Sequence, residues 1–128
     1  MTIGMCSLFL SWLRDRPANA TFTSTTTITG ILEAFGTQIR SSVYEEVQES
    51  IAAFGCFVYI GDESADTNNV EEAVHIVRYL DKTGRPQEKF ISLTPLHSTT
   101  AEGIYEKVVA VMDRAHIPMD KMAFCCFD

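Results

Sequence analysis

The order of apolar and polar positions along the chain predicts a helix, three strands, a second helix and a last strand. From Ile31 to Ile51, apolar residues recur at spacings of one, three and four, which is the pattern of a helix that buries one face. Gly36 interrupts this stripe, so one long helix and two helical segments that meet near Gly36 fit it equally well. We expect all the apolar residues of the stripe to pack in a hydrophobic core.

Three short apolar runs in the middle of the chain predict strands over residues 54–60, 73–80 and 88–93. The first run has no polar alternation, which is typical of a strand buried on both faces at the centre of a sheet. The second run alternates, with Val74 and Ile76 on one face and His75 and Val77 on the other. Gly84 follows in a turn where it can supply a positive φ, so the second and third strands are expected to form a hairpin.

The last part of the chain predicts a helix and a fourth strand. Thr99 and Glu102 fit a capping box, in which the Thr99 hydroxyl accepts the amide hydrogen of Glu102 and the carboxylate reaches back. Apolar residues behind them repeat at helical spacing, and residues 122–127 form a final apolar run. Because a crossover helix joins strands that run in the same direction, the last strand is expected to be parallel to one of the others. The fold class is therefore α/β.

The composition is that of a soluble globular domain, with 128 residues of which 46 % are hydrophobic. Ten basic and 17 acidic residues give a net charge of −7, which disfavours a free-standing DNA-binding module because such modules neutralise phosphates with Lys and Arg. The four cysteines form no Cys-x-x-Cys pair, so a structural zinc site has little support. Met5–Leu13 is too short for a membrane span and is not preceded by basic residues, so we expect no membrane partner and no targeting signal.

Two aspartates are the candidate site. Asp62 comes directly after the first apolar strand, and Asp128 comes directly after the last. If both strands are central and parallel, the two carboxylates meet at the edge of the sheet where ligands commonly bind. A shared proton or a bound cation relieves their repulsion, and Mg²⁺ prefers one or two carboxylates together with water and phosphate oxygens. A turn or a helix cap is the alternative role for each aspartate, and His97 is interpreted as a loop histidine.

Several segments in series resemble a known family. Residues 61–69, Gly-Asp-Glu-Ser-Ala-Asp-Thr-Asn-Asn, are similar to the Asp-Glu-Ser/Thr-Thr-Asp-x-Ser-Asn segment of hAT-type transposases. The closest branch is the domain of unknown function 4371, found in transposase-derived, zinc-finger MYM-type-like proteins. Residues 77–84 are similar to the Arg-Tyr-Val-Asp-x-x-Gly of that branch. The resemblance covers residues 28–128, and Ala65 departs from it because the family has Thr there.

The resemblance implies a truncated RNase H-like fold, with three antiparallel strands, a crossover helix, a fourth strand parallel to the first and no fifth strand. We therefore expect an irregular segment over residues 1–27 and a partial RNase H-like domain over residues 28–128. In the family, the positions of Asp62 and Asp128 are the first two members of a catalytic, metal-binding Asp-Asp-Glu triad. The third member is absent here, so we expect any binding of Mg²⁺ to be weak.

Two functions remain open at this point. The sequence favours a transposase-derived domain that is not catalytically active alone and acts, if expressed, as an interaction or regulatory module. The alternative is the N-terminal part of a Mg²⁺-dependent DNA strand-transferase, the catalytic core of a transposase. The family implies DNA and a homodimer as partners through regions missing here, so this chain alone is not expected to grip DNA. The resemblance also implies an intracellular, nuclear location.

Overall fold

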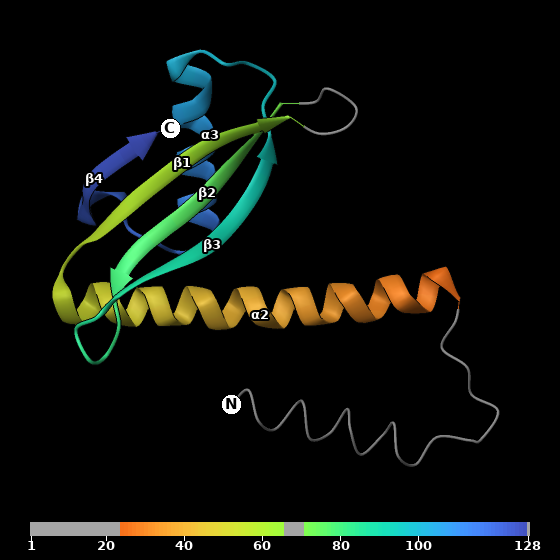
Figure 1. Ribbon diagram of the computed structural model, residues 1–128, viewed down its shortest axis with the longest axis horizontal. Coiled ribbons are helices and arrows are strands. Elements are labelled where there is room, and N and C mark those ends of the chain that lie inside the picture. Colours follow the sequence, from red (N-terminus) through yellow and green to blue (C-terminus); the bar gives the residue numbers. More distant parts are fainter. Residues whose placement is uncertain (1–23, 66–70, 128) are drawn as a thin grey trace. The chain divides into compact units, whose positions relative to one another are not determined.

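The computed structural model describes residues 24–65 and 71–127. Their elements are α2 (Thr25–Phe54), β1 (Phe57–Ala65), β2 (Glu71–Leu80), β3 (Pro86–Pro95), α3 (Ala101–Arg114), the 3-10 helix η1 (Met119–Lys121) and β4 (Met122–Phe127) (Figure 1). The chain divides into two compact units, Met1–Ser42 and Val43–Asp128, and the sheet and α3 belong to the second. No helix of the described ranges is long and apolar enough to cross a membrane.

The four strands form one sheet in the order β3-β2-β1-β4. β2 is antiparallel to both β1 and β3, whereas β4 is parallel to β1. Parallel neighbours cannot be joined by a tight turn, so the chain crosses over through α3, which lies behind the sheet in Figure 1. This is the strand order that was predicted from the resemblance to RNase H-like α/β domains.

The hydrophobic core lies on one face of the sheet. It joins side chains of the four elements α2, β1, β2 and α3 to Ile91 of β3: Val47, Ile51, Phe57, Tyr59, Val77, Tyr79, Val108, Val111 and Met112. Val58 and Ile60, which alternate with the buried residues of β1, remain half-buried. The prediction that this strand is buried on both faces is therefore wrong, because the described helices that pack on the sheet lie on its core face.

α2 is a single helix, so Gly36 does not divide it. The helix ends where Gly55 adopts a φ of 82° and its N–H donates to the carbonyl of Ile51 at 2.8 Å. The expectation that the whole stripe packs in the core is wrong for its N-terminal half, where Leu32 is 65 % and Ile39 61 % exposed. These exposed residues belong to the unit Met1–Ser42, whereas the buried Val47 and Ile51 belong to the unit Val43–Asp128, which contains the sheet.

Several element boundaries differ from the sequence prediction. The first strand, β1, begins at Phe57 rather than at residue 54, because Phe54 is the last residue of α2. β1 also continues beyond residue 60 to Ala65, because β2 supplies backbone partners for the polar residues there. The N-cap of α3 is Thr100 rather than Thr99, since the Thr100 side chain accepts the N–H of Gly103 at 3.2 Å. Apolar residues that repeat at helical spacing along α3, as predicted, form its buried face: Val108, Val111 and Met112.

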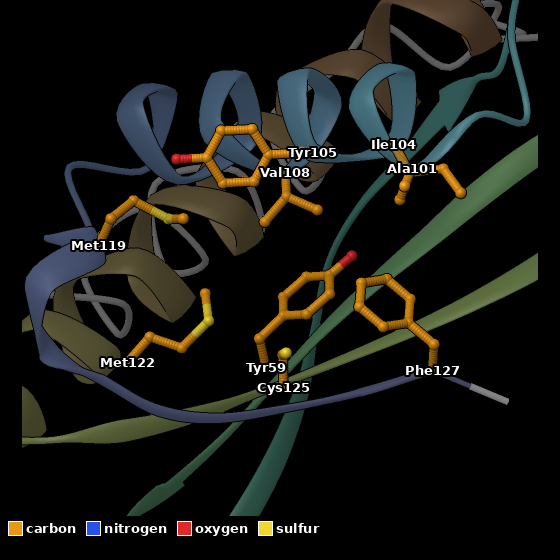
Figure 2. A pocket seen from close by; sticks show the side chains of 9 residues that line it. All are labelled: Tyr59, Ala101, Ile104, Tyr105, Val108, Met119, Met122, Cys125 and Phe127. Carbon is orange, nitrogen blue, oxygen red and sulfur yellow. The ribbon is translucent and has the colours of Figure 1, made fainter.

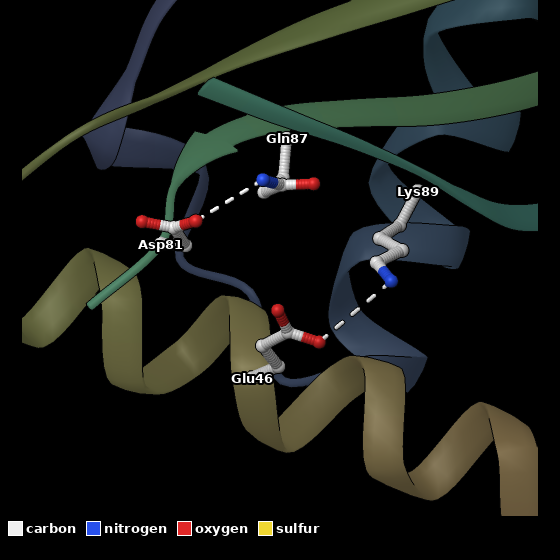
Figure 3. A network of polar contacts seen from close by, with 4 residues as sticks. All are labelled: Glu46, Asp81, Gln87 and Lys89. Carbon is white, nitrogen blue, oxygen red and sulfur yellow. Dashed lines mark hydrogen bonds and ion pairs between the residues drawn. The ribbon is translucent and has the colours of Figure 1, made fainter. Parts of the chain in front are cut away.

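Asp81 organises the turn between β2 and β3. One of its oxygens accepts the hydroxyl of Thr83 at 2.6 Å and the backbone N–H groups of Thr83 at 2.8 Å and Arg85 at 3.0 Å. The other oxygen accepts Nε2 of Gln87 at 3.1 Å (Figure 3). These hydrogen bonds, that of the Thr83 hydroxyl first, lower the pKa of Asp81 from 3.8 to about 2. Gly84 has the predicted positive φ, 78°.

Ion pairs connect the second half of α2 to the same hairpin. Nζ of Lys82 lies 3.0 Å from Oε2 of Glu49, and Nζ of Lys89 lies 3.9 Å from Oε2 of Glu46 (Figure 3). All four side chains are at least 39 % exposed, so each pair contributes less than about 1 kcal/mol. The buried core therefore holds α2 against the sheet, and the ion pairs only add to it.

Candidate functional site

Asp62 lies inside β1 rather than after it, which corrects the sequence prediction. Its partner on β2 is Val74, and its exposed side chain alternates with the buried Gly61, so it lies on the face of the sheet opposite the core. On the other side of β1, Phe127 of β4 pairs with Gly61. Asp128 follows Phe127 directly in the sequence but lies outside the described residues, so the meeting of the two carboxylates stays a prediction.

The predicted metal site can be compared with the described donors. Within residues 24–65 and 71–127, no group of three or more His, Cys, Asp or Glu residues could hold a metal ion. The ion pairs among the described side chains use Glu46, Glu49, Glu88 and Asp120, and leave the carboxylate of Asp62 to solvent. A carboxylate oxygen is a ligand that Mg²⁺ prefers, but Mg²⁺ needs several oxygens in octahedral geometry. The described donors therefore fit one ligand of a magnesium site and do not complete it.

Gly61 allows β4 to approach β1 closely at this edge. A Cβ at this position would lie 2.7 Å from Cε1 of Phe127 and 2.9 Å from the hydroxyl oxygen of Tyr59. The ring of Phe127 packs on that of Tyr59 with centroids 5.6 Å apart. A side chain at position 61 would push these rings away, so the glycine is required for the strand contact next to Asp62.

A buried chain of hydrogen bonds crosses three strands beneath this edge. The hydroxyl of Tyr59 lies 2.8 Å from Nδ1 of His75, and Nε2 of His75 lies 2.8 Å from Oγ1 of Thr94. Burial, followed by the charge of Arg114, lowers the pKa of His75 from 6.5 to about 4. Burial, followed by the influence of Cys125, raises the pKa of Tyr59 to about 12. At neutral pH the imidazole is therefore uncharged and donates one of these hydrogen bonds while it accepts the other.

The hydrogen bonds that join Tyr59, His75 and Thr94 were not predicted from the sequence. Sequence reasoning placed His75 correctly on the face that carries Val77, but it assigned no partner to the imidazole. A histidine at a core-facing position signals a need for polar partners, because buried polar groups are nearly always hydrogen-bonded. Finding Tyr59 and Thr94 as those partners requires the pairing of β1, β2 and β3. His97, in contrast, is an exposed residue of the loop after β3, as predicted.

The face of the sheet opposite the core is largely apolar. Its middle row takes one side chain from each strand, because the strand register aligns Cys126, Ile60, Ile76 and Phe90. Together with Val58 and Phe124, we call these residues the open face. Phe90 is 58 % and Phe124 73 % exposed. Contiguous exposed apolar surface of this kind marks interaction sites in soluble proteins.

A second apolar surface lies between α3 and β4. It is a cavity of about 360 Å³, which we call the α3–β4 groove. Figure 2 shows Tyr105 and other side chains of α3 along one wall, and Tyr59, Cys125 and Phe127 along the other. The cavity volume lies in the range of pockets that bind small ligands or single anchoring side chains. The lining is apolar apart from the tyrosine hydroxyls and the thiol, so the groove is suited to binding apolar groups.

The comparison with protein families agrees with the fold and with the sequence resemblance. The family model DUF4371, described as ZMYM1/FAM200, RNase-like domain, matches residues 8–128. The match begins nearer the N-terminus than residue 28, so the similarity extends further than the motifs from which it was first inferred. An RNase-like domain also agrees with the strand order β3-β2-β1-β4. The chain therefore belongs to the ZMYM1/FAM200 RNase-like domain family, the transposase-derived domain of unknown function 4371.

Proposed function

We propose that this chain is a transposase-derived RNase-like domain that acts as a protein-interaction or regulatory module and does not cleave DNA alone. The open face carries this proposal. Its middle row is apolar across all four strands, and Phe90 and Phe124 at its two sides are exposed. A partner that covers this face gains roughly 25 cal/mol for each Å² of apolar surface removed from water.

The charge of the chain supports the same proposal. A net charge of −7 repels a DNA backbone, whereas proteins that hold DNA neutralise several phosphates with Lys and Arg. Among the described residues, the basic groups Arg78, Lys82 and Lys89 are already paired with carboxylates. Among the described basic residues of the sheet and its hairpin, this leaves Arg85 outside an ion pair, so little positive charge remains there for a nucleic acid.

A second candidate function is the core of a Mg²⁺-dependent DNA strand-transferase, and the strand register favours it. Phe127 pairs with Gly61 on neighbouring parallel strands, and in the sequence Asp62 follows Gly61 and Asp128 follows Phe127. In this function, Asp62 and Asp128 would hold Mg²⁺, which would polarise a phosphate oxygen of the DNA. A second copy of the chain and DNA would then be the partners.

Metal binding and DNA cleavage separate the two candidates. Isothermal titration with Mg²⁺ and Mn²⁺, and a cleavage assay on duplex DNA, would compare the chain with Asp62→Asn and Asp128→Asn. Asp113→Asn is the matched control, because Asp113 is an exposed aspartate on α3. We expect no cleavage, and metal binding that is millimolar or weaker and the same in all variants. Cleavage that is lost in the two site variants and kept in the control would support the strand-transferase instead.

Site-specific crosslinking tests the interaction module. A photo-crosslinking phenylalanine analogue at position 90 reports on the open face, and the same analogue at position 82 in the hairpin turn is the control. We expect a discrete crosslinked protein from position 90 only, and its loss when Phe124→Asp places a charge on the same face. Phe124 is exposed, so this substitution leaves the core intact. The absence of any product specific to position 90 would contradict the proposal.

A further inference from the structure

Two hydroxyl groups are buried where α2 packs on the sheet. Ser50 of α2 is 6 % exposed and Tyr79 of β2 is 2 % exposed. Neither Oγ of Ser50 nor the hydroxyl oxygen of Tyr79 has a hydrogen-bond partner among the described residues. Buried polar groups are nearly always hydrogen-bonded, because an unpaired one loses its interaction with solvent and gains nothing in exchange. Each hydroxyl therefore needs a partner that the described side chains and backbone do not supply.

The sheet register places Tyr79 among polar side chains that face α2. Tyr79 pairs with Gln87 of β3, and Lys89, two residues further along β3, lies on the same face of the sheet. Glu46 of α2 lies across from them, with Oε2 3.9 Å from Nζ of Lys89 (Figure 3). Ser50 follows Glu46 by one helical turn and lies on the same side of α2. We call this region the polar seam, and it comprises Glu46, Ser50, Tyr79 and Lys89.

The polar groups of the seam approach one another without direct hydrogen bonds. Burial, followed by the hydrogen-bonding influence and the charge of Glu46, raises the pKa of Tyr79, so the Glu46 carboxylate lies near the hydroxyl. The hydroxyl nevertheless has no partner at hydrogen-bond geometry. The 3.9 Å between Glu46 and Lys89 is also longer than a hydrogen bond, and water commonly bridges polar groups at such distances.

Water matches the donors and acceptors of the seam. The hydroxyls of Ser50 and Tyr79 can each donate or accept a hydrogen bond, the carboxylate accepts, and the ammonium group donates. A buried water molecule typically makes about three hydrogen bonds to such groups. Ser50 is the smallest of the three buried residues of α2, so it leaves more room than a valine or isoleucine would. An ion is not required, because the charges of Glu46 and Lys89 already balance.

We propose that the polar seam holds an internal water molecule, which bridges the hydroxyls of Ser50 and Tyr79 and the carboxylate of Glu46. The water satisfies both buried hydroxyls, so it couples a residue of α2 to a residue of β2 that lacks a direct hydrogen bond to it. Glu46 and Lys89 are 43 % and 39 % exposed, so the water can enter and leave at this side of the seam. The site lies on the core face of the sheet and is independent of the open face and of the proposed function.

A double-mutant cycle in urea tests the shared water. Ser50→Ala and Tyr79→Phe each remove one hydroxyl, and each should raise the unfolding equilibrium constant about fivefold, because the remaining groups no longer hold the water. The double variant should raise the constant by about the same factor as one single variant, because the water is lost only once. Tyr105→Phe removes an exposed hydroxyl on α3 and is the control. Its effect should be small and should add to that of Ser50→Ala.

Magnetic relaxation dispersion of water oxygen detects the water directly, because its amplitude reports long-lived internal water molecules. We expect the amplitude to fall by the equivalent of about one water molecule in the double variant, and to stay at the wild-type value in Tyr105→Phe. An unchanged amplitude in the double variant would overturn the inference. Additive effects of the two single variants would also overturn it, because the hydroxyls would then have separate partners. A more stable Ser50→Ala variant would do the same, because it would show that this hydroxyl is left unpaired.

Discussion

Acidification should destabilise this fold through His75. The imidazole is 0 % exposed, and burial holds its pKa at about 4 instead of 6.5. Between these two pH values the unfolded chain binds a proton that the folded chain does not, so the free energy of unfolding falls as the pH falls. The full stabilisation is present above pH 6.5. Linkage predicts a loss of about 2 kcal/mol by about pH 5 and about 3 kcal/mol by about pH 4.

Urea unfolding at a series of pH values, followed by circular dichroism, measures this loss. The wild-type chain should lose stability between pH 6.5 and 4, the two pKa values of His75. His75→Gln has no imidazole, so it should be less stable at neutral pH and lose most of this pH dependence. His97→Gln, which removes an exposed loop histidine, should follow the wild type.

The reasoning is refuted if His75→Gln keeps the pH dependence of the wild-type chain. It is also refuted if the wild-type chain becomes more stable on acidification below pH 6.5. In the first case another group titrates in this range, and in the second the folded state accepts a proton more readily than the unfolded state. Either result would mean that the hydrogen bonds of His75 with Tyr59 and Thr94 do not keep the imidazole neutral in the folded protein.

Further predictions concern the strand contact, the hairpin turn and the alkaline range. Gly61→Ala should lower the free energy of unfolding by about 1–3 kcal/mol, because its Cβ meets Phe127, and the amides of β4 should be the first to exchange hydrogen. Gly36→Ala, in the open surroundings of α2, should raise the free energy of unfolding by up to about 1 kcal/mol. Asp81→Ala should lower the urea midpoint at neutral pH. The difference from the wild type should shrink as the pH falls from 3.8 towards 2, because the stabilisation that comes with the depressed pKa of Asp81 is lost as the carboxylate takes up a proton. A constant difference would contradict that reasoning. The raised pKa of Tyr59 should make wild-type stability fall as the pH rises from 10 towards 12, and Tyr59→Phe should remove this contribution; an unchanged alkaline profile would contradict it.

Local pattern was sufficient to predict most of the fold. The apolar runs located all four strands, Gly84 marked the hairpin, and the crossover helix required a parallel last strand. These features follow from the spacing of apolar residues and from turn chemistry, which act over a few positions. The continuation of β1 beyond residue 60 was not predictable in this way, because its polar residues are held in a strand by their partners on β2.

The candidate site depended more on distant contacts. Asp62 was found from its position near the end of an apolar run, but the chain of Tyr59, His75 and Thr94 requires three strands to be aligned. The exposed N-terminal half of α2 shows the same limit, because an amphipathic stripe indicates which face is apolar and not how much of it is covered.

Side chains alternate between the two faces of the sheet along β1, so the strand register determines which residues face the core and which face solvent. Tyr59 and Gly61 are on the core face, whereas Ile60 and Asp62 are on the open face. A slip of one residue would exchange the two sets, which would turn the Asp62 carboxylate towards the ring of Phe127 and expose Tyr59. Burying a carboxylate without a partner costs several kcal/mol, and the slip would also break the hydrogen bond of Tyr59 to His75. The charge of Asp62 therefore disfavours the slipped register, while Gly61 makes room for the correct one, so the residues around the candidate site also help to determine the fold.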